Sequence, residues 1–283
     1  MRTPTFSRLH CSIHILLSAW LTLSGCQPPD ETSQRQEQLK REAFKLRMGM
    51  GLTPEDAEGH FQLGKIYYDL GEHDKAIEAF QTAVSLEDEN VQSHNHLGLV
   101  YLRLRLNDEA VNAFREAIRV EPDNPVYYNN LGYVYDSEDE FEEAVKAYRM
   151  AIQIDPKFQD AYYNLASTYH ARGEFEVAIE NYERVIGLDE SDADAHVSLG
   201  EAFQDSGQLN QAIRTYEKAL SLDSTDPEVY FRLSQLYHEK GNASKTQSNL
   251  NLFLDKAAGL PQFEDKIENV KRLKRELAAK QQQ

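Results

Sequence analysis

Two asparagines, Asn130 and Asn164, are the residues whose type and spacing first suggest a chemical role. They stand 34 residues apart, each directly before a leucine, in the stretches YNNLG and YNLAS. A primary amide carries two N–H donors and an oxygen acceptor, so it can bond the N–H and C=O of an extended peptide without reading its side chains. The recurrence therefore favours a surface that binds polypeptide over a catalytic centre.

Histidine and cysteine are poorly placed for catalysis or metal binding. His94 and His96 are two residues apart, so on a helix their side chains diverge and cannot share a metal ion. The two cysteines, Cys11 and Cys26, leave the rest of the chain without a disulfide or a thiolate. The sequence also lacks a phosphate-binding loop, a nucleophile elbow and a zinc-protease motif. We therefore expect no enzymatic activity, no metal and no cofactor.

The composition excludes one class of partner. The 283 residues carry a net charge of -17, and no stripe of lysine and arginine is present to neutralise phosphates, so we expect no nucleic acid. The apolar fraction of 41% is slightly below that of a typical globular domain, although 15 tyrosines and 12 phenylalanines supply core material. This combination suits an elongated, thin-walled fold.

The first 25 residues have the pattern of a secretion signal. Arg2 and Arg8 precede a mostly apolar run over 13–23, which is too short to cross a bilayer but suits a signal peptide. The run ends in LSGC, which resembles the lipobox of bacterial lipoproteins. This resemblance implies cleavage before Cys26, lipidation of that cysteine and anchoring in the membrane. An ordinary signal peptide with an incidental cysteine, and a chance apolar stretch, are the alternatives.

The segment after the cysteine is expected to connect the anchor to the folded body. Gln27 stands where enteric lipoproteins retained in the inner membrane carry aspartate, so the resemblance favours the outer membrane, facing the periplasm. Residues 26–34 predict a lipidated polar tether, and 35–56 predict a short N-terminal helix and a linker. The apolar positions of that helix are Leu39, Ala43 and Leu46.

From Ala57 onward the sequence repeats every 34 residues without insertion, directly after a helix-start signal at 53–56. The copies are 57–90, 91–124, 125–158, 159–192, 193–226 and 227–260. Position 7 of every copy is leucine, position 8 is small and position 11 is aromatic. Because position 11 lies four residues after position 7 and three after position 8, the three positions predict one packed face of a helix.

A second helix is expected in each copy. The first five copies carry alanine at position 20 and phenylalanine or tyrosine at position 24. Small residues at positions 8 and 20 let two helices approach closely, while the aromatic side chains fill the gaps beside them. Gly71, Gly173, Gly207 and Gly241 fall between the helices, where a left-handed residue is useful. The predicted product is a tight antiparallel helical hairpin.

This pattern resembles the tetratricopeptide repeat over about residues 57–260. The resemblance implies an all-α fold in which helix-turn-helix hairpins stack into a right-handed superhelix, an α-solenoid. Arg105 and Asp139 depart from the pattern by replacing the turn glycine. Position 4, often tryptophan in the family, also differs, and its histidines are expected to pack between helices. Its residues are His60, His94, Tyr128, Tyr162, His196 and Tyr230.

The end of the repeat array is expected to be capped. The last copy, 227–260, loses the pattern at Thr246 and Phe253, which is typical of a terminal repeat. Over 261–283 an apolar stripe predicts a capping helix and a tail, with lysine and arginine facing water. The stripe is Phe263, Ile267, Val270, Leu273 and Leu277.

The resemblance also supplies a binding geometry, in which positions 2, 5, 6, 9, 12 and 13 of the first helices line a concave groove. Position 6 is polar throughout, at Gln62, His96, Asn130, Asn164, Ser198 and Arg232. A polar-aromatic patch around it is expected to include Asn129, Tyr133, Tyr163, Ser167 and His170. We therefore expect Asn130 on an exposed edge of its helix. The alternative is that asparagine before Leu-Gly is simply common in these repeats.

A C-terminal carboxylate is not the expected ligand. The carboxylate clamp of chaperone-binding relatives needs basic residues and asparagine at set groove positions of three successive repeats. Here Lys65 is isolated, Val126 occupies position 2 of its repeat, and Asn130 stands where an arginine is required.

The resemblances together imply a membrane-anchored adaptor or scaffold that binds proteins or extended peptide segments in its groove. In outline it is similar to tetratricopeptide lipoproteins that scaffold cell-wall hydrolases. The alternative is an assembly or pilotin-like factor for a pilus or secretion complex at the outer membrane. The sequence leaves the partner open, including whether the chain binds copies of itself.

Overall fold

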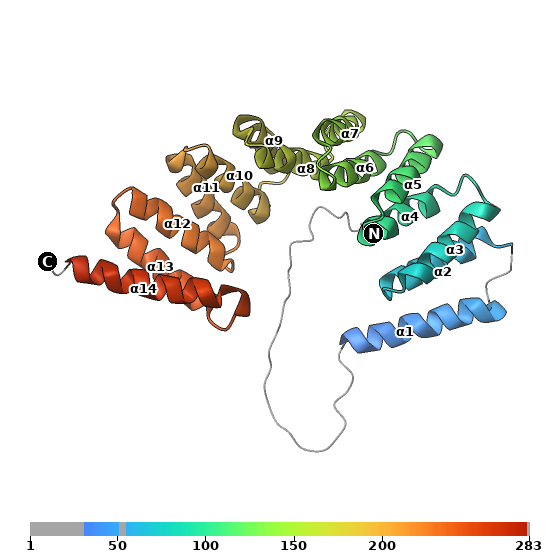
Figure 1. The fold of residues 1–283 in the computed structure, drawn as a ribbon, viewed down its shortest axis with the longest axis horizontal. Coiled ribbons are helices and arrows are strands. Elements are labelled where there is room, and N and C mark those ends of the chain that lie inside the picture. Colours follow the sequence, from blue (N-terminus) through green and yellow to red (C-terminus); the bar gives the residue numbers. More distant parts are fainter. Residues whose placement is uncertain (1–30, 51–54, 282–283) are drawn as a thin grey trace, which may run out of the picture. The chain divides into compact units, whose positions relative to one another are not determined.

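The computed structural model describes residues 31–50 and 55–281, and within them the chain forms helices joined by short turns. An N-terminal helix, α1 (Glu31–Lys45), continues into a π-helical turn, η2 (Leu46–Met50), and pairs of helices follow (Figure 1). The first helices of the pairs are α2 (Ala57–Asp69), α4 (Val91–Arg103), α6 (Pro125–Ser137), α8 (Gln159–Ala171), α10 (Ala193–Asp205) and α12 (Pro227–Glu239). The second helices are α3 (His73–Leu86), α5 (Asn107–Val120), α7 (Phe141–Ile154), α9 (Phe175–Leu188), α11 (Leu209–Leu222) and α13 (Ala243–Ala257).

Side-chain caps start the first helices. The residue before five of them accepts a backbone N–H of the first turn, at Asp56, Asn90, Asn124, Asp192 and Asp226. Asp56 Oδ1, for example, accepts from the Gly59 N–H at 2.9 Å. Such caps satisfy backbone donors that have no partner within the helix, so these five first helices each have their own start signal. Of the predicted signal at 53–56, Thr53 and Pro54 lie outside the described residues.

The two helices of each pair are joined by a turn that needs one left-handed residue. Gly71, Gly173, Gly207 and Gly241 have positive φ, as predicted. Arg105 (φ 58°) and Asp139 (φ 60°) adopt the same conformation although each carries a Cβ. In the Asp139 turn the Glu140 N–H donates to the Tyr135 carbonyl at 2.9 Å, which closes the turn as in the glycine-containing copies. The turn is therefore retained at the cost of local strain, about 1 kcal/mol for a non-glycine residue.

Glycine at position 8 faces an aromatic ring at position 24 of the same repeat. A Cβ on Gly132 would lie 2.7 Å from the Tyr148 ring, and a Cβ on Gly98 would lie 2.6 Å from the Phe114 ring. Both rings are fully buried. The predicted pairing of small residues with aromatic side chains is therefore confirmed, and it sets how closely the two helices of a repeat approach.

Tyrosine at position 11 links one repeat to the one before it. Its hydroxyl bonds the side chain at position 25 of the preceding second helix, 20 residues earlier. The pairs are Gln81 with Tyr101 at 3.1 Å, Arg115 with Tyr135 at 2.8 Å, and Tyr237 with Glu217 at 2.5 Å. A tyrosine at this position therefore contributes its ring to the core and its hydroxyl to a contact between repeats.

The N-terminal helix packs on the first repeat. Ala43 is 5% exposed and belongs to the same core cluster as Phe61 and Tyr67. Arg47 Nη1 also donates to the Tyr67 hydroxyl at 3.4 Å. Because α1 begins at Glu31, residues 31–34 form its first turn, and their prediction as part of a polar tether is wrong. This segment contains no proline or glycine, and an acidic first residue favours a helix N-terminus.

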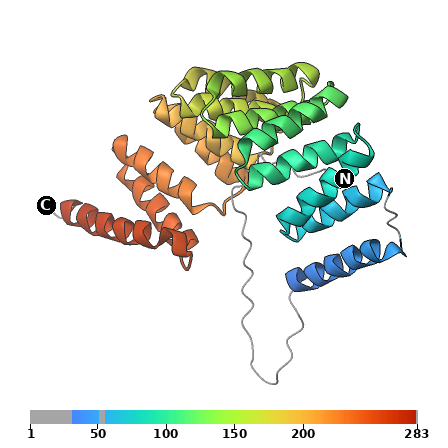
Figure 2. The ribbon, with the colours of Figure 1, turned by 45° about the vertical axis from the view of Figure 1, so that its right-hand side comes forward.

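The C-terminal helix α14 (Glu264–Gln281) covers the last pair, as predicted. It follows a short 3-10 turn, η3 (Pro261–Phe263), and lies against α13 (Figure 2). Val270 is 1% exposed and packs with Phe253 and Leu250, which are fully buried. Phe263, Ile267 and Leu273 border the same cluster. The side chain of Leu277 lies outside the described residues.

The predicted all-α class, a stack of helix-turn-helix hairpins with a C-terminal capping helix, is confirmed. The chain divides into two compact units at the Ala161–Tyr162 link, within α8. We call them the N-terminal and C-terminal units and describe each by itself. Over the residues that the structure describes, no helix combines the length and apolar character needed to cross a membrane. The predicted signal segment and Cys26 fall outside these residues.

Candidate functional site

The predicted asparagines of the N-terminal unit are buried. Asn130 Nδ2 on α6 donates to Asn95 Oδ1 on α4 at 3.1 Å. Asn130 is 4% exposed and Asn129 is 2% exposed. The expectation that Asn130 stands on an exposed edge is therefore wrong. Successive first helices pack so closely that position 6 of one reaches position 5 of the helix before it, and the amide joins two repeats.

The other predicted residues of the N-terminal unit are half-buried, at Gln62, His96 and Tyr133. His96 Nδ1 lies 2.8 Å from the Gln92 carbonyl, and its ring meets Phe61 edge-on with centroids 5.1 Å apart. Burial lowers the pKa of His96 below its ordinary value, and the bond to the Gln92 carbonyl offsets only part of that effect. The imidazole is therefore mainly neutral at pH 7.

In the C-terminal unit, α8 and α10 are joined by a pair of hydroxyls. Tyr163 Oη and Ser198 Oγ lie 2.9 Å apart. The Tyr163 ring meets Tyr182 edge-on with centroids 5.5 Å apart, and burial raises the pKa of the Tyr163 hydroxyl. Asn164 is 8% exposed, and its backbone carbonyl accepts from Thr168 Oγ1 at 2.9 Å. Of these residues, Tyr163 is the least buried.

Further along the same two helices, His170 Nε2 on α8 lies 2.9 Å from Asp205 Oδ2 on α10. The His170 side chain is 18% exposed and that of Asp205 is 50% exposed, so solvent or a ligand can reach the pair. The ring also meets Phe175 edge-on with centroids 5.6 Å apart. Ser167, one turn before His170, is exposed. This end of α8 and α10 therefore presents accessible donors and acceptors.

An ion pair continues the arrangement onto α12. Arg232 Nη2 lies 2.8 Å from Glu201 Oε1 on α10, and its Nε lies 3.7 Å from Glu228 Oε1, beyond hydrogen-bond distance. Burial raises the pKa of Glu201, while the neighbouring Arg232 and His170 lower it in part. The surroundings of Glu201 on α10 thus include Arg232 on α12, His170 on α8 and Asp205 on its own helix. We call Tyr163, Ser167, His170, Ser198, Glu201, Asp205, Glu228 and Arg232 the C-terminal binding surface.

One spacing accounts for three of the side-chain pairs on the first helices. In each pair, position 5 or 12 of one repeat meets position 6 or 13 of the next, 35 residues later. The pairs are Asn95 with Asn130, Tyr163 with Ser198, and His170 with Asp205. Side chains of different chemistry thus form equivalent contacts, because the helix geometry is repeated.

Sequence reasoning did not single out Asn95, Glu201 and Asp205. All three stand at repeat positions 5, 9 and 13, which the family resemblance assigns to the groove. Applying those positions to every repeat would have found them. Their pairings with side chains of a neighbouring repeat were not visible, because such pairings depend on how neighbouring first helices are offset.

Two of the three histidines at position 4 are buried, and the third, His60, is half-buried. His94 is 6% exposed with Nε2 2.9 Å from the Asp88 carbonyl, and His196 is 8% exposed with Nε2 3.3 Å from the Glu190 carbonyl. The inter-helix position predicted for these two residues is therefore confirmed. Within residues 31–50 and 55–281, side chains that could ligate a metal do not gather in groups of three or more.

The fold and the polar faces of its first helices define a helical-repeat scaffold for protein interactions. The chain belongs to the tetratricopeptide-repeat family. One model, described as "TPR repeat", matches residues 64–104, 166–207 and 204–241. Two models described as "tetratricopeptide repeat" match residues 95–157 and 147–180. The matches together run without a gap from residue 64 to residue 241, which is more than half of the chain.

Solved structures share the fold. MamA is 28% identical over 57% of this chain and 95% of its own, with a TM-score of 0.53. PilW, a widely conserved type IV pilus biogenesis factor, is 20% identical over 74% of this chain and 95% of its own, with a TM-score of 0.63. YrrB, a tetratricopeptide-repeat protein with an unusual peptide-binding site, is 18% identical over 65% and 95%, with a TM-score of 0.54. No curated protein matches the sequence significantly.

Proposed function

We propose that this protein is a lipid-anchored adaptor of the cell envelope whose C-terminal binding surface holds an extended segment of another protein. The observation that carries the proposal is the series of polar pairs on α8, α10 and α12. Tyr163 with Ser198, His170 with Asp205, and Arg232 with Glu201 lie on successive first helices. They combine hydroxyl, imidazole, carboxylate and guanidinium groups on one face of the unit.

The chemistry of this surface suits a peptide backbone. An extended segment presents N–H donors and C=O acceptors along its length, and the surface offers both partners. Ser167 is exposed, and the Arg232 side chain is 28% exposed, so both can be reached from solvent. The aromatic edge of Tyr163 adds apolar contact area at low entropic cost, as tyrosines do in binding hot spots. YrrB, which shares the fold, has a peptide-binding site of its own.

The binding proposal is tested by photocrosslinking in cells. A photoreactive residue is placed at Ser167 on this surface, and a matched control is placed at Glu180, which is exposed on the second helix α9. We expect a defined partner to crosslink from position 167 and not from position 180. The double variant Glu201→Gln/Arg232→Gln, expressed at equal abundance, should lose that product without leaving one buried charge unpaired. Equal crosslinking from both positions, or an undiminished product in the double variant, would contradict the proposal.

The anchor is proposed from the LSGC stretch that ends at Cys26. The start of α1 at Glu31 is compatible with it, because five extended residues reach at most about 18 Å and would hold α1 close to the membrane. Phe44 near the end of α1 is 64% exposed, and Met48 in the following turn η2 is 67% exposed. Both lie close in sequence to the exposed basic residues Arg41 and Lys45. Exposed apolar and basic side chains in one segment favour a lipid–water interface.

Metabolic labelling with a palmitate analogue, combined with membrane fractionation, tests the anchor. Wild type and the matched control Cys11→Ala should be labelled and sediment with membranes, whereas Cys26→Ala should be unlabelled and released. Label that persists in Cys26→Ala would disprove lipidation at this cysteine. Separation of inner and outer membranes then tests the proposed outer-membrane location facing the periplasm.

An assembly factor for a pilus or secretion complex is the alternative function. The fold likeness to PilW motivates it, although at 20% identity this likeness concerns the fold alone. Deletion of the gene separates the two functions. Loss of secretin multimers would favour the assembly factor, whereas intact multimers together with altered cell-wall hydrolysis would favour the adaptor.

A further inference from the structure

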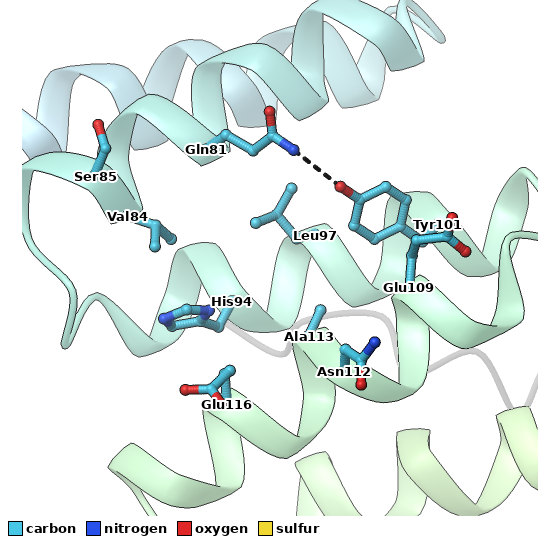
Figure 3. A pocket seen from close by; sticks show the side chains of 10 residues that line it. All are labelled: Gln81, Val84, Ser85, His94, Leu97, Tyr101, Glu109, Asn112, Ala113 and Glu116. Carbon is cyan, nitrogen blue, oxygen red and sulfur yellow. Dashed lines mark hydrogen bonds between the residues drawn. The ribbon is translucent and has the colours of Figure 1, made fainter.

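Two hollows of the same construction lie away from the polar pairs of the first helices. Each has a volume of about 360 Å³ and is lined by the second helix of one repeat and both helices of the next. The N-terminal hollow lies among α3, α4 and α5 (Figure 3). The C-terminal hollow lies among α9, α10 and α11. Their linings correspond at a spacing of three repeats, as His94 does to His196 and Tyr101 to Phe203.

The floor of the N-terminal hollow is held in place by hydrogen bonds. His94 is 6% exposed with Nε2 2.9 Å from the Asp88 carbonyl, and Ala113 is 7% exposed. Gln81 Nε2 donates to the Tyr101 hydroxyl at 3.1 Å across the hollow's upper side (Figure 3). Because these hydrogen bonds already hold the side chains, little conformational entropy is lost when a ligand enters the hollow.

The hollow and the polar pairs use opposite faces of the first helix. The hollow is lined by positions 4, 7 and 11, whereas the pairs use positions 5, 6, 9, 12 and 13. At 100° per residue these two sets are roughly half a turn apart. A ligand in the hollow therefore does not occupy the surface proposed for the extended segment.

The rims of the two hollows carry different charges. Glu109 and Glu116 stand on the rim of the N-terminal hollow, and the described side chains that line it include no lysine or arginine. In the C-terminal hollow the position equivalent to Glu116 is occupied by Lys218, and Arg214 also lines this hollow. Arg119 Nε lies 2.7 Å from Glu116, but it is half-exposed and neutralises only one of the two carboxylates. The N-terminal rim is therefore acidic.

We propose that the N-terminal hollow is a docking site for a basic segment of a partner protein, which inserts one aliphatic or aromatic side chain between lysine or arginine neighbours. The buried floor at Leu97 and Ala113 removes the inserted side chain from water, which is the main source of affinity at such a site. Glu109 and Glu116 pair with the flanking cations and reject an acidic segment. The net charge of -17 further attracts a basic partner from solution.

The test measures fluorescence anisotropy of a labelled peptide with the purified full chain. The probe has a central leucine, two lysines on each side and terminal glycines. One comparison peptide replaces the leucine by serine, and another replaces the lysines by glutamates.

Because an acidic protein attracts any cationic peptide, the decisive comparison is between protein variants. Ala113→Leu fills the N-terminal hollow and Glu116→Lys gives it the charge of its counterpart, while Thr215→Leu and Lys218→Glu are the matched changes in the C-terminal hollow.

We expect the leucine peptide to bind about tenfold more tightly than the serine peptide, and the glutamate peptide not to bind. Ala113→Leu and Glu116→Lys should each weaken binding about fivefold or more, while Thr215→Leu changes it less than twofold. Lys218→Glu should not lower the affinity. Circular dichroism of each variant checks that the fold is retained. Equal affinity for the leucine and serine peptides, or an affinity that Ala113→Leu and Glu116→Lys leave unchanged, would overturn the proposal.

Discussion

Asn130 on α6 donates its side-chain N–H to the side-chain oxygen Oδ1 of Asn95 on α4 at 3.1 Å, and this bond joins the first helices of two successive repeats. Asn130 is 4% exposed, so water cannot readily replace the partner if the bond is lost. The Asn130 amide therefore stabilises the packing of one repeat on the next. Other polar groups of the predicted site are more accessible than Asn130, among them Ser167, His170 and Arg232 in the C-terminal unit.

Removing the Asn130 amide should destabilise the protein. We expect Asn130→Ala to lower the free energy of unfolding by about 1–2 kcal/mol, because the side-chain oxygen of the half-buried Asn95 loses its donor. The double variant with Asn95→Ala should cost less than the sum of the single changes, with a coupling of about 0.5–1 kcal/mol. Urea denaturation measures both quantities, and Asn112→Ala at an exposed position is the control. Additive effects of the two single substitutions would show that the bond contributes nothing.

The glycine at position 8 should not tolerate a methyl group. In Gly132→Ala the new Cβ would lie 2.7 Å from the buried Tyr148 ring, so we expect a loss of about 1–3 kcal/mol from overpacking. Gly187→Ala is the matched control within α9, because no atom lies within 4 Å of its added Cβ. That change should stabilise the protein by about 0.5–1 kcal/mol through helix propensity. Equal effects at the two positions, measured by thermal denaturation, would contradict this account of the packing.

Glycine should be better than the natural residue at the two strained turns. Arg105 and Asp139 have φ values of 58° and 60°, a region where a Cβ costs free energy. We expect Arg105→Gly and Asp139→Gly each to raise stability by about 0.5–1 kcal/mol, with the smaller gain at Asp139 because aspartate tolerates this region better. Lys146→Gly, on the exposed side of α7, should instead lower stability by about 1 kcal/mol. A loss of stability at both turns would show that the side chains outweigh the strain.

Stability should fall in mild acid because of His96. Burial lowers its pKa in the folded state below the ordinary value of 6.5, so the unfolded chain binds the proton more readily. This contribution is fully present above pH 6.5 and is lost as the pH falls from about 6.5 toward the lowered pKa, by at most about 1.4 kcal/mol per pH unit. In His96→Gln the free energy of unfolding should decline less between pH 7 and pH 5 than it does in wild type. The exposed His238→Gln should leave it unchanged, and an unchanged decline in His96→Gln would exclude this residue as a cause.

Some of the candidate site was predictable from the sequence and some was not. His170 and Arg232 stand at repeat positions that face the predicted groove, and both are partly accessible. Asn130 and Asn164 stand at an equivalent groove position, yet they are 4% and 8% exposed. Repeat position indicates the direction of a side chain from its helix axis. It does not indicate how far the neighbouring helix buries that side chain.

The sequence by itself determined the features that depend on residues close together in the chain. The Asp56 and Asn124 caps, the left-handed residues at Arg105 and Asp139, and the fit of Gly132 against Tyr148 all involve residues separated by less than one repeat length. Periodicity is sufficient there, because caps, turns and hairpin packing use fixed short spacings. Repetition of one such hairpin along the chain then defines the fold class.

Only the tertiary structure decided which polar residues serve the stack and which remain accessible. The bond from Asn130 to Asn95 crosses two repeats, and it depends on the offset and distance between their first helices. The hollow above His94 likewise needs α3, α4 and α5 together, since each helix supplies only one wall. Such features depend on the packing of whole side chains between helices, and a one-dimensional pattern does not contain that information.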